Sequence, residues 1–317
     1  MTHPPNSMRK TIQTHHHPQP HTLYTYIARL IATLEHYGQH RTAETYRSTL
    51  NSFRNFRQGK DLSLKDIDTP LLTDYAFFLK TRKGLAHNTV MFYLKRLRAI
   101  YNKAVEEGWT EDRHPFRKIS TASEKTAKRA ILIKDIQQLK DLDLSSHPVR
   151  CFARDIFLFS FCTRGMSFID IALLRKTDLQ NDTLKYHRKK TGQTLSMHWE
   201  PWMQRIAEKH ESAPDSPYLL SIIRNPEGDI RKQCHTALTL INRHLKEIGK
   251  ILGLPAPLTM HVARHSWASI AHNEGIPLSV ISEGLGHESE KTTRIYLASL
   301  ESRIIDNANQ QILRKLL

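Results

Sequence analysis

A polar stretch over residues 112–129 divides this chain into two blocks of helical pattern. The stretch contains Pro115 and many basic residues but no apolar period, which is typical of a linker. On each side of it, apolar residues recur at the three-to-four-residue spacing of amphipathic helices. A chain of 317 residues is long enough for two domains. We therefore expect one domain over residues 21–111, a second over residues 130–317, and a disordered His/Pro-rich tail over residues 1–20.

The first block, from Leu23 to Gly108, predicts a small domain of four helices. The third helix opens at Thr69-Pro70, which we interpret as a cap followed by a proline in the first helical position. The fourth helix ends at Gly108. It also carries four basic residues: Lys95, Arg96, Arg98 and Lys103.

The second block is also mainly helical, but its apolar period changes over residues 183–199. Leu184, Tyr186 and Arg188 alternate with polar residues, and the alternation resumes after a turn at Gly192. A period of two residues on both sides of a turn predicts a β-hairpin. The expected fold class is therefore mainly α with a small β-sheet.

The charge of the chain predicts a polyanionic partner. It has 47 Lys and Arg residues against 31 Asp and Glu residues, which gives a formal net charge of +16. Such an excess attracts nucleic acids through their phosphates, although it does not separate DNA from RNA. The sequence has neither a basic amphipathic anchor nor a lipidation signal, so we expect no membrane partner.

The cysteines and the N-terminus predict a cytoplasmic protein. Cys151, Cys162 and Cys234 are far apart and lie in apolar helical patterns. We interpret them as small buried hydrophobic residues in a reducing compartment, not as a disulfide frame or a zinc site. The chain has no apolar run of about 18 residues, as a membrane span needs, and no signal-peptide layout.

Three short segments near the C-terminus combine histidine, arginine and tyrosine. They read His261-Val-Ala-Arg264-His265, Leu285-Gly286-His287 and Thr292-Thr-Arg-Ile-Tyr296. Their order and spacing resemble the tyrosine recombinase (phage integrase) family, in which H-x-x-R-H precedes L-G-H and a tyrosine follows nine residues later. A single piece such as Leu-Gly-His would be a weak signal, but the combination is specific.

The resemblance implies that Tyr296 attacks a DNA phosphate. A free tyrosine has a pKa near 10, so the phenol needs a proton acceptor and a cationic environment, and His261 is the candidate base. Arg264 offers a planar fork that matches phosphate oxygens. The family uses the histidine at the position of His287 to hydrogen-bond the phosphate. His265 is also within the motif, and we expect it to give structural support.

The hairpin turn supplies a candidate general acid. It reads Lys189-Lys190-Thr191-Gly192, and the family places a catalytic lysine just before such a Thr-Gly turn. We therefore choose Lys190 over Lys189 as the group that protonates the departing 5′-oxygen.

A second arginine of the family, on the helix before the hairpin, has no direct counterpart. A gap-free count places Ser167 at that position and Asp170 at the position of the family's glutamate. Arg164 lies about one helical turn earlier and is our choice. Arg175 and a site that works with one arginine stay open. The Arg-Gly-Met-Ser segment resembles integrases of conjugative and mobilizable elements.

The resemblance further implies a SAM-like core-binding domain over residues 21–111 and a mixed α/β catalytic domain over residues 130–317. The expected partners are double-stranded DNA recombination sites, with a homotetramer on two paired sites and accessory DNA-bending proteins as a further class. Leu297–Leu317 would dock on a neighbouring subunit or fold back on its own domain. A bacterial enzyme of this kind is expected at the nucleoid.

The implied 3′-phosphotyrosyl intermediate conserves the energy of the broken bond, so we expect no cofactor, metal or ATP. Integration, excision, inversion and dimer resolution share one active site, and the residues do not choose among them. Two other functions use parts of the same pattern. One is a DNA-binding regulator on an inactive scaffold, and the other is a type IB-like topoisomerase.

Overall fold

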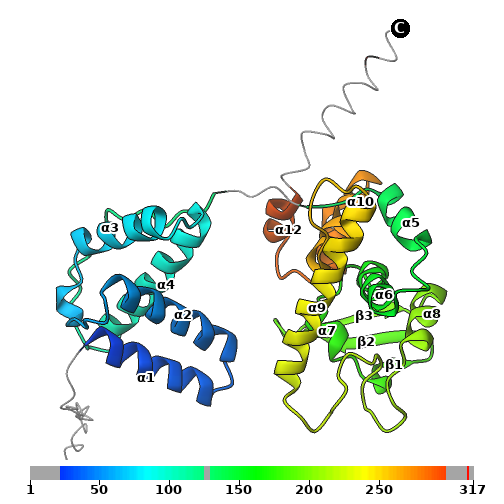
Figure 1. The fold of residues 1–317 in the computed structure, drawn as a ribbon, viewed down its shortest axis with the longest axis horizontal. Helices are drawn as coiled ribbons and strands as arrows, with labels where there is room; N and C mark the ends of the chain where they lie inside the picture. The colour runs from blue at the N-terminus through cyan, green and yellow to red at the C-terminus, as the bar shows by residue number, and fades with distance from the viewer. Residues whose placement is uncertain (1–21, 125–128, 298–312, 314–317) are drawn as a thin grey trace, which may run out of the picture. The chain divides into compact units, whose positions relative to one another are not determined.

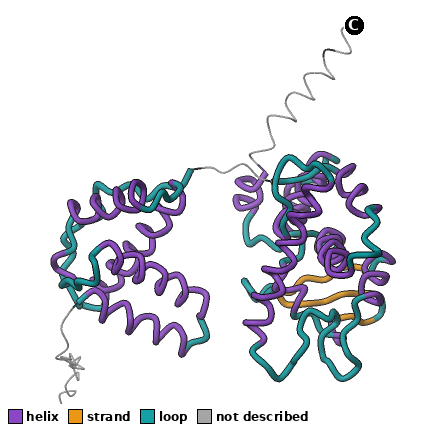
Figure 2. Tube along the Cα trace, viewed as in Figure 1, coloured by secondary structure: helices purple, strands orange, loops and turns teal. Residues whose placement is uncertain are grey.

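The computed structural model describes residues 22–124, 129–297 and 313. It divides into two compact units at Thr126/Ala127, each with a hydrophobic core of its own (Figure 1). Within the described part of the chain, strands occur only in the second unit (Figure 2). No described helix is both long enough and apolar enough to cross a membrane. The expected N-terminal tail lies outside the described residues, as does the expected docking tail after Leu297, apart from Leu313.

The first unit contains the four helices that the apolar stripes predict. They are α1 (Leu23–His36), α2 (His40–Phe56), α3 (Thr69–Phe77), which continues into a π-helical turn (Phe78–Arg82), and α4 (His87–Glu106). The core combines aliphatic side chains with large aromatic ones, and Tyr26, Phe53, Tyr75 and Tyr101 are all buried. Large aromatic residues remove much apolar surface from water, which stabilises a small helical domain.

The start of α3 differs from the sequence-based expectation by one residue. Asp68 caps the helix, because its Oδ1 accepts a hydrogen bond from the backbone nitrogen of Leu71 at 2.9 Å. Thr69 is the first helical residue, and its hydroxyl donates instead to the carbonyl of Pro115 at 2.9 Å. The prediction of a Thr69 cap was wrong because both residue types can cap a helix and only tertiary contacts separate them.

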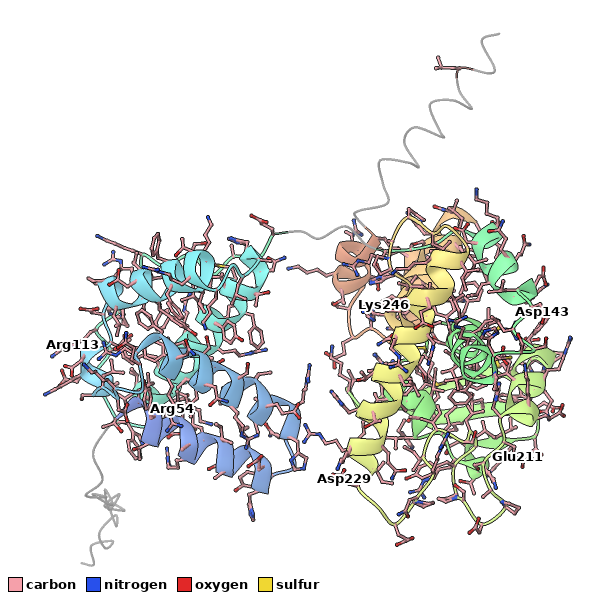
Figure 3. The ribbon with its side chains drawn as sticks, in the orientation of Figure 1. Arg54, Arg113, Asp143, Glu211, Asp229 and Lys246 are labelled. Carbon is pink, nitrogen blue, oxygen red and sulfur yellow. The ribbon has the colours of Figure 1, made fainter. Side chains whose placement is uncertain are left out.

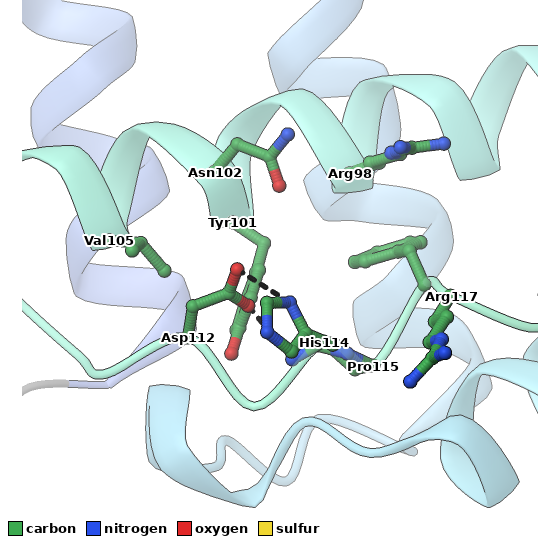
Figure 4. A pocket seen from close by; sticks show the side chains of 9 residues that line it. Arg98, Tyr101, Asn102, Val105, Asp112, His114, Pro115 and Arg117 are labelled. Carbon is green, nitrogen blue, oxygen red and sulfur yellow. Dashed lines mark hydrogen bonds and ion pairs between the residues drawn. The ribbon is translucent and has the colours of Figure 1, made fainter.

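Residues 112–124, which the sequence assigns to a linker, lie against the first unit. The Tyr101 hydroxyl accepts a hydrogen bond from the backbone nitrogen of Arg113 at 3.1 Å, and the ring of Phe116 is buried beside Tyr101. Figure 4 shows His114 and its neighbours against this face of α4. Phe116, the partly buried Ile119 and hydrogen bonds with the backbone hold a segment that has no apolar period.

The second unit is a larger helical body with one small antiparallel sheet. Its first part consists of α5 (Ile133–Asp141), α6 (Pro148–Cys162), α7 (Phe168–Ala172), β1 (Leu179–Gln180), β2 (Thr183–His187) and β3 (Thr194–His198). Its second part consists of α8 (Pro201–Lys209), α9 (Ile230–Ile251), α10 (Met260–Asn273), α11 (Leu278–Gly284) and α12 (Glu290–Leu297).

The sheet has the order β1-β2-β3, so the expected hairpin β2–β3 is confirmed and gains β1 as a short edge strand.

At the start of α9, Asp229 caps the helix (Figure 3).

Helix α6 is the centre of the second unit, where it packs against α8, α9 and α10. Beyond its C-terminal end, Arg164 and Gly165 have φ angles of 58° and 73°, in the left-handed region. A Cβ atom on Gly165 would lie 2.7 Å from the Cα atom of Arg264 in α10. Only glycine allows the end of α6 to approach α10 this closely.

We predict that Gly165→Ala destabilises the protein more than Gly192→Ala does. Both glycines have positive φ angles, but a Cβ atom on Gly192 would meet nothing within 4 Å. Both variants therefore carry the same kind of backbone strain. The difference between their losses of unfolding free energy measures the steric contact with Arg264. Gly165→Ala is expected to lower the free energy of unfolding by about 1–3 kcal/mol more than the control. Urea unfolding measures both values, and equal losses would show that the close approach is not restrictive.

Candidate active site

The guanidinium of Arg264 connects three segments of the second unit. Its side chain is buried, with 8 % exposed. Nη1 donates to the carbonyl of Gly165 at 2.9 Å, while Nη2 donates to the carbonyl of Leu285 at 2.6 Å and contacts Nε2 of His287 at 3.1 Å. The fold thus brings the arginine of the first motif to the Leu-Gly-His segment, here called the 285–287 turn.

The contacts of His287 fix its protonation and orientation. A guanidinium can only donate, so Nε2 of His287 accepts from Arg264 and Nδ1 carries the hydrogen. Nδ1 then donates to the hydroxyl of Thr293 at 2.7 Å. Burial, and after it the positive charges of Arg264, Arg188 and Lys190, lower the pKa of His287 to about 4. The imidazole is therefore neutral at pH 7.

Tyr296 lies on α12, which packs against α10 and α11. Two residues fasten this helix. Thr293 is fully buried and holds His287, and Leu297 packs into a small apolar cluster with Ala268, Ile281 and Leu285. Tyr296 follows Thr293 by three positions and directly precedes Leu297. The helix of the expected nucleophile is therefore held beside the segment that carries His287.

His261 occupies the first turn of α10, three residues before Arg264. Its side chain is exposed, and its ring meets the ring of His265 edge to face, with the centroids 4.4 Å apart. His265 is buried. The exposed ring of His261 therefore packs against the buried ring of His265, in the first turn of the helix that carries Arg264.

The hairpin turn lies near His287, and Lys190 is exposed on it. The backbone bonds from Arg188 to Gln193 and from Gly192 to Arg188, at 2.9 and 2.8 Å, close the turn. The positive charge of Lys190 acts on the pKa of His287. A Cβ atom on Gly286 would lie 2.9 Å from Leu195 and 3.0 Å from Arg188, which flank the hairpin turn, so the hairpin lies against the 285–287 turn.

The two candidates for the missing helix arginine lie in different surroundings. Arg164 is half-buried, and its Cδ atom is 3.7 Å from the point where a Cβ atom on Gly284 would stand. It thus runs beside the end of α11, directly before the 285–287 turn. Arg175 is exposed; its backbone nitrogen donates to Asp178 and its backbone pairs with Tyr218.

Ser167, at the position of the family arginine, takes part in a short polar chain. Its hydroxyl donates to Oδ2 of Asp170 at 2.7 Å, and Oδ1 of Asp170 accepts from the backbone nitrogen of Lys189 at 2.8 Å. Asp170 is buried and so ties the start of α7 to the end of β2.

Arg188 is a site residue that the motifs do not select. Its side chain is buried, with 8 % exposed, and its Nη1 donates to the carbonyl of Gly286. The sequence contains one signal for it. Arg188 continues the alternation of Leu184 and Tyr186, both of which are buried, so its strand position points to the interior.

The charges of three arginines act on the phenol of Tyr186. Burial raises the pKa of Tyr186 to about 12, and the carboxylate of Asp170 acts in the same direction. The charges of Arg188, Arg264 and Arg164 oppose this rise. Contacts with Gly286, Leu285 and the position of Gly284 likewise bring Arg188, Arg264 and Arg164 to one short segment of the second unit.

We predict that His287 makes the protein less stable as the pH falls from about 6.5 to about 4. Its pKa is about 4 in the folded protein and near 6.5 in an unfolded chain, so the unfolded state binds more protons in this window. The contribution of neutral His287 to the free energy of unfolding is complete above pH 6.5 and is lost as the pH falls toward 4. Thermal unfolding at pH 7 and pH 5 should show a smaller pH effect in His287→Gln. The exposed His198→Gln variant should keep the wild-type effect, and an unchanged effect in His287→Gln would contradict the assignment.

Comparisons with known proteins place both units in one family. The model described as the phage integrase SAM-like domain matches residues 22–121, and that of the phage integrase family matches residues 164–303. A tyrosine recombinase of Pseudothermotoga lettingae is 22 % identical over 277 residues, which cover 85 % of this chain and 91 % of that protein. The tyrosine recombinase XerD of Xanthomonas axonopodis is 26 % identical, over 80 % of this chain and 86 % of that protein.

Solved structures have the same fold. Lambda integrase, solved as a tetramer bound to a Holliday junction, has a TM-score of 0.67 at 18 % identity, over 87 % of this chain and 77 % of that chain. The Tn1549 transposon integrase, in complex with a circular intermediate DNA, has a TM-score of 0.64 at 15 % identity, over 90 % and 99 % of the two chains. Taken with the motif residues that the fold gathers around Arg264, these matches show that the chain belongs to the tyrosine recombinase (phage integrase) family of DNA strand cleaving and rejoining enzymes.

Proposed function

We propose that this chain is a site-specific DNA recombinase in which Tyr296 forms a covalent bond with the scissile phosphate. The observation that carries the proposal is the set of contacts made by Arg264. One buried guanidinium holds His287, and His287 in turn holds Thr293 on the helix that bears Tyr296. Hydrogen bonds thus connect the cation of Arg264, the neutral imidazole of His287 and the helix that bears Tyr296.

The chemistry follows from the residue types. The phenolic oxygen of Tyr296 attacks phosphorus and loses its proton to His261, while the bond from phosphorus to the 5′-oxygen breaks. Lys190 protonates the departing 5′-oxygen, which leaves as a hydroxyl. Arg264 stabilises negative charge on the non-bridging oxygens. His287 donates to the bound phosphate in the tautomer that carries its hydrogen on Nε2, and Nδ1 then accepts from the hydroxyl of Thr293. The product is a 3′-phosphotyrosyl link, and attack on it by a 5′-hydroxyl of another strand rejoins the DNA and frees Tyr296.

A second cation is needed because two non-bridging oxygens gain charge in the transition state. Arg164 is the sequence-based choice, and its place beside the end of α11 supports it over Arg175. His265 supports His261 by ring packing, in agreement with a structural role.

Double-stranded DNA is the proposed partner of both domains. The net charge of +16 and the exposed Lys95, Arg98 and Lys103 on α4 support contact with phosphates. Solved relatives are described as dimers and tetramers on DNA, and we extend this to a homotetramer on two paired sites. Assays with purified protein test whether accessory DNA-bending proteins are required. Such a recombinase would act at the bacterial nucleoid.

The decisive experiment is covalent capture of DNA. Purified protein is incubated with a pool of genomic duplex fragments, and fragments that stay attached after denaturation are sequenced to identify the site. A duplex of that site is then nicked next to the cleavage point, so that a short released strand diffuses away and the adduct accumulates.

We predict that wild-type protein forms this adduct, that Tyr296→Phe forms none, and that Arg264→Ala forms it about 10²–10³-fold more slowly. No adduct with any fragment would favour a DNA-binding regulator. Adducts without sequence preference, together with relaxation of supercoils, would favour a topoisomerase.

Arg164 and Arg175 give a second, independent prediction. Arg164→Ala should slow adduct formation at least about tenfold, because it removes a cation from the phosphate site. Arg175→Ala is the matched control and should stay within about twofold of wild type. Activity that survives the loss of Arg164 would remove that residue from the site.

A further inference from the structure

The guanidinium of Arg188 is a buried charge with an incomplete set of partners. Among the described residues, no carboxylate forms an ion pair with it, and its one hydrogen bond, from Nη1, goes to the carbonyl of Gly286. Burying a cation without a counter-charge is unfavourable, so such groups are usually paired or receive an anionic ligand. The position of Arg188 therefore requires a reason beyond packing.

Arg188 and Arg264 are held by neighbouring carbonyls of one tight turn. Arg264 donates to Leu285 and Arg188 donates to Gly286, so both guanidinium groups converge on the 285–287 turn from different elements. Gly286 makes this possible. A Cβ atom at that position would lie only 3.0 Å from the Cδ atom of Arg188. The turn that carries His287 is thus flanked by two planar, permanently charged donors.

The polar chain at the start of α7 links Arg188 to the position where the family has its helix arginine. Ser167 occupies that position and binds Asp170, and Asp170 binds the backbone of Lys189, the residue directly after Arg188. A serine side chain carries no charge, but the segment after β2 that is tied to it brings a guanidinium to the same region. The positive charges of Arg188 and Arg264 both lower the pKa of His287.

We propose that Arg188 is a further catalytic residue, which binds a non-bridging oxygen of the scissile phosphate opposite Arg264. This inference rests on the proposed recombinase function. The guanidinium of Arg188, directly after β2, supplies the charge that Ser167 lacks, and Arg164 adds a further positive charge beside the end of α11. In the DNA-free protein, the carbonyl of Gly286 holds the guanidinium of Arg188 in place for the incoming phosphate. A bound phosphate oxygen supplies the counter-charge that the protein does not.

The test uses three variants on the nicked site duplex. Arg188→Gln removes the charge but keeps an amide donor for the carbonyl of Gly286, so it tests the loss of charge even if Arg188→Ala does not fold. Lys185→Ala, on the exposed side of β2 just before Arg188, is the matched control for general loss of positive charge. We expect Arg188→Gln and Arg188→Ala to cleave about 10²–10³-fold more slowly and Lys185→Ala to stay within about threefold of wild type.

A second substrate separates catalysis from structural support. A methylphosphonate at the scissile position has no negative charge, so an arginine that neutralises the phosphate becomes dispensable there. The ratio of wild-type to Arg188→Gln cleavage rates should fall from about 10²–10³ on the phosphodiester to below about ten on the methylphosphonate. A ratio that stays the same on both substrates assigns Arg188 a structural role only and overturns the inference.

The two proposals can fail separately. If wild-type protein forms no Tyr296-dependent adduct, the proposed recombinase function fails. If wild type forms the adduct and Arg188→Gln cleaves the phosphodiester within fivefold of it, only the assignment of Arg188 fails.

Discussion

The second unit is organised around one buried guanidinium, that of Arg264. Its hydrogen bonds reach Gly165 and Leu285, which lie 99 and 21 residues away in the sequence. Charge-assisted bonds of this kind are stronger than neutral ones and hold their partners in fixed directions. The end of α6, the start of α10 and the 285–287 turn therefore occupy defined positions before any DNA arrives. Preorganised donors of this type do not have to reorient when charge develops on a phosphate.

Local patterns predicted much of this fold because the forces behind them are local. The helical stripes of the first unit and the change of period at residues 183–199 follow from side-chain spacing along one element. The motif spacing likewise selected Arg264 and His287, which the fold brings into contact. The side chain of His261 is exposed at the first turn of α10, where a base for an incoming substrate would need to stand.

The features that were missed depend on partners distant in sequence. Thr69 and Asp68 are equally good caps by residue type, and the carbonyl of Pro115 decides between them. Phe116 anchors its segment through Tyr101, without any apolar period. Arg188 has the alternation of a buried strand residue, but an arginine is usually exposed, so its contact with Gly286 could not be foreseen from the sequence.

The bond between His287 and Thr293 couples the state of one imidazole to the position of α12. In the DNA-free protein, Thr293 accepts the only ring hydrogen of a neutral imidazole, and so it sets which nitrogen is left with a lone pair to accept from Arg264. If α12 moves away, the imidazole loses this restraint. Under the proposed function, the same movement carries away the residue proposed as the nucleophile, so displacement of one helix would inactivate two groups together.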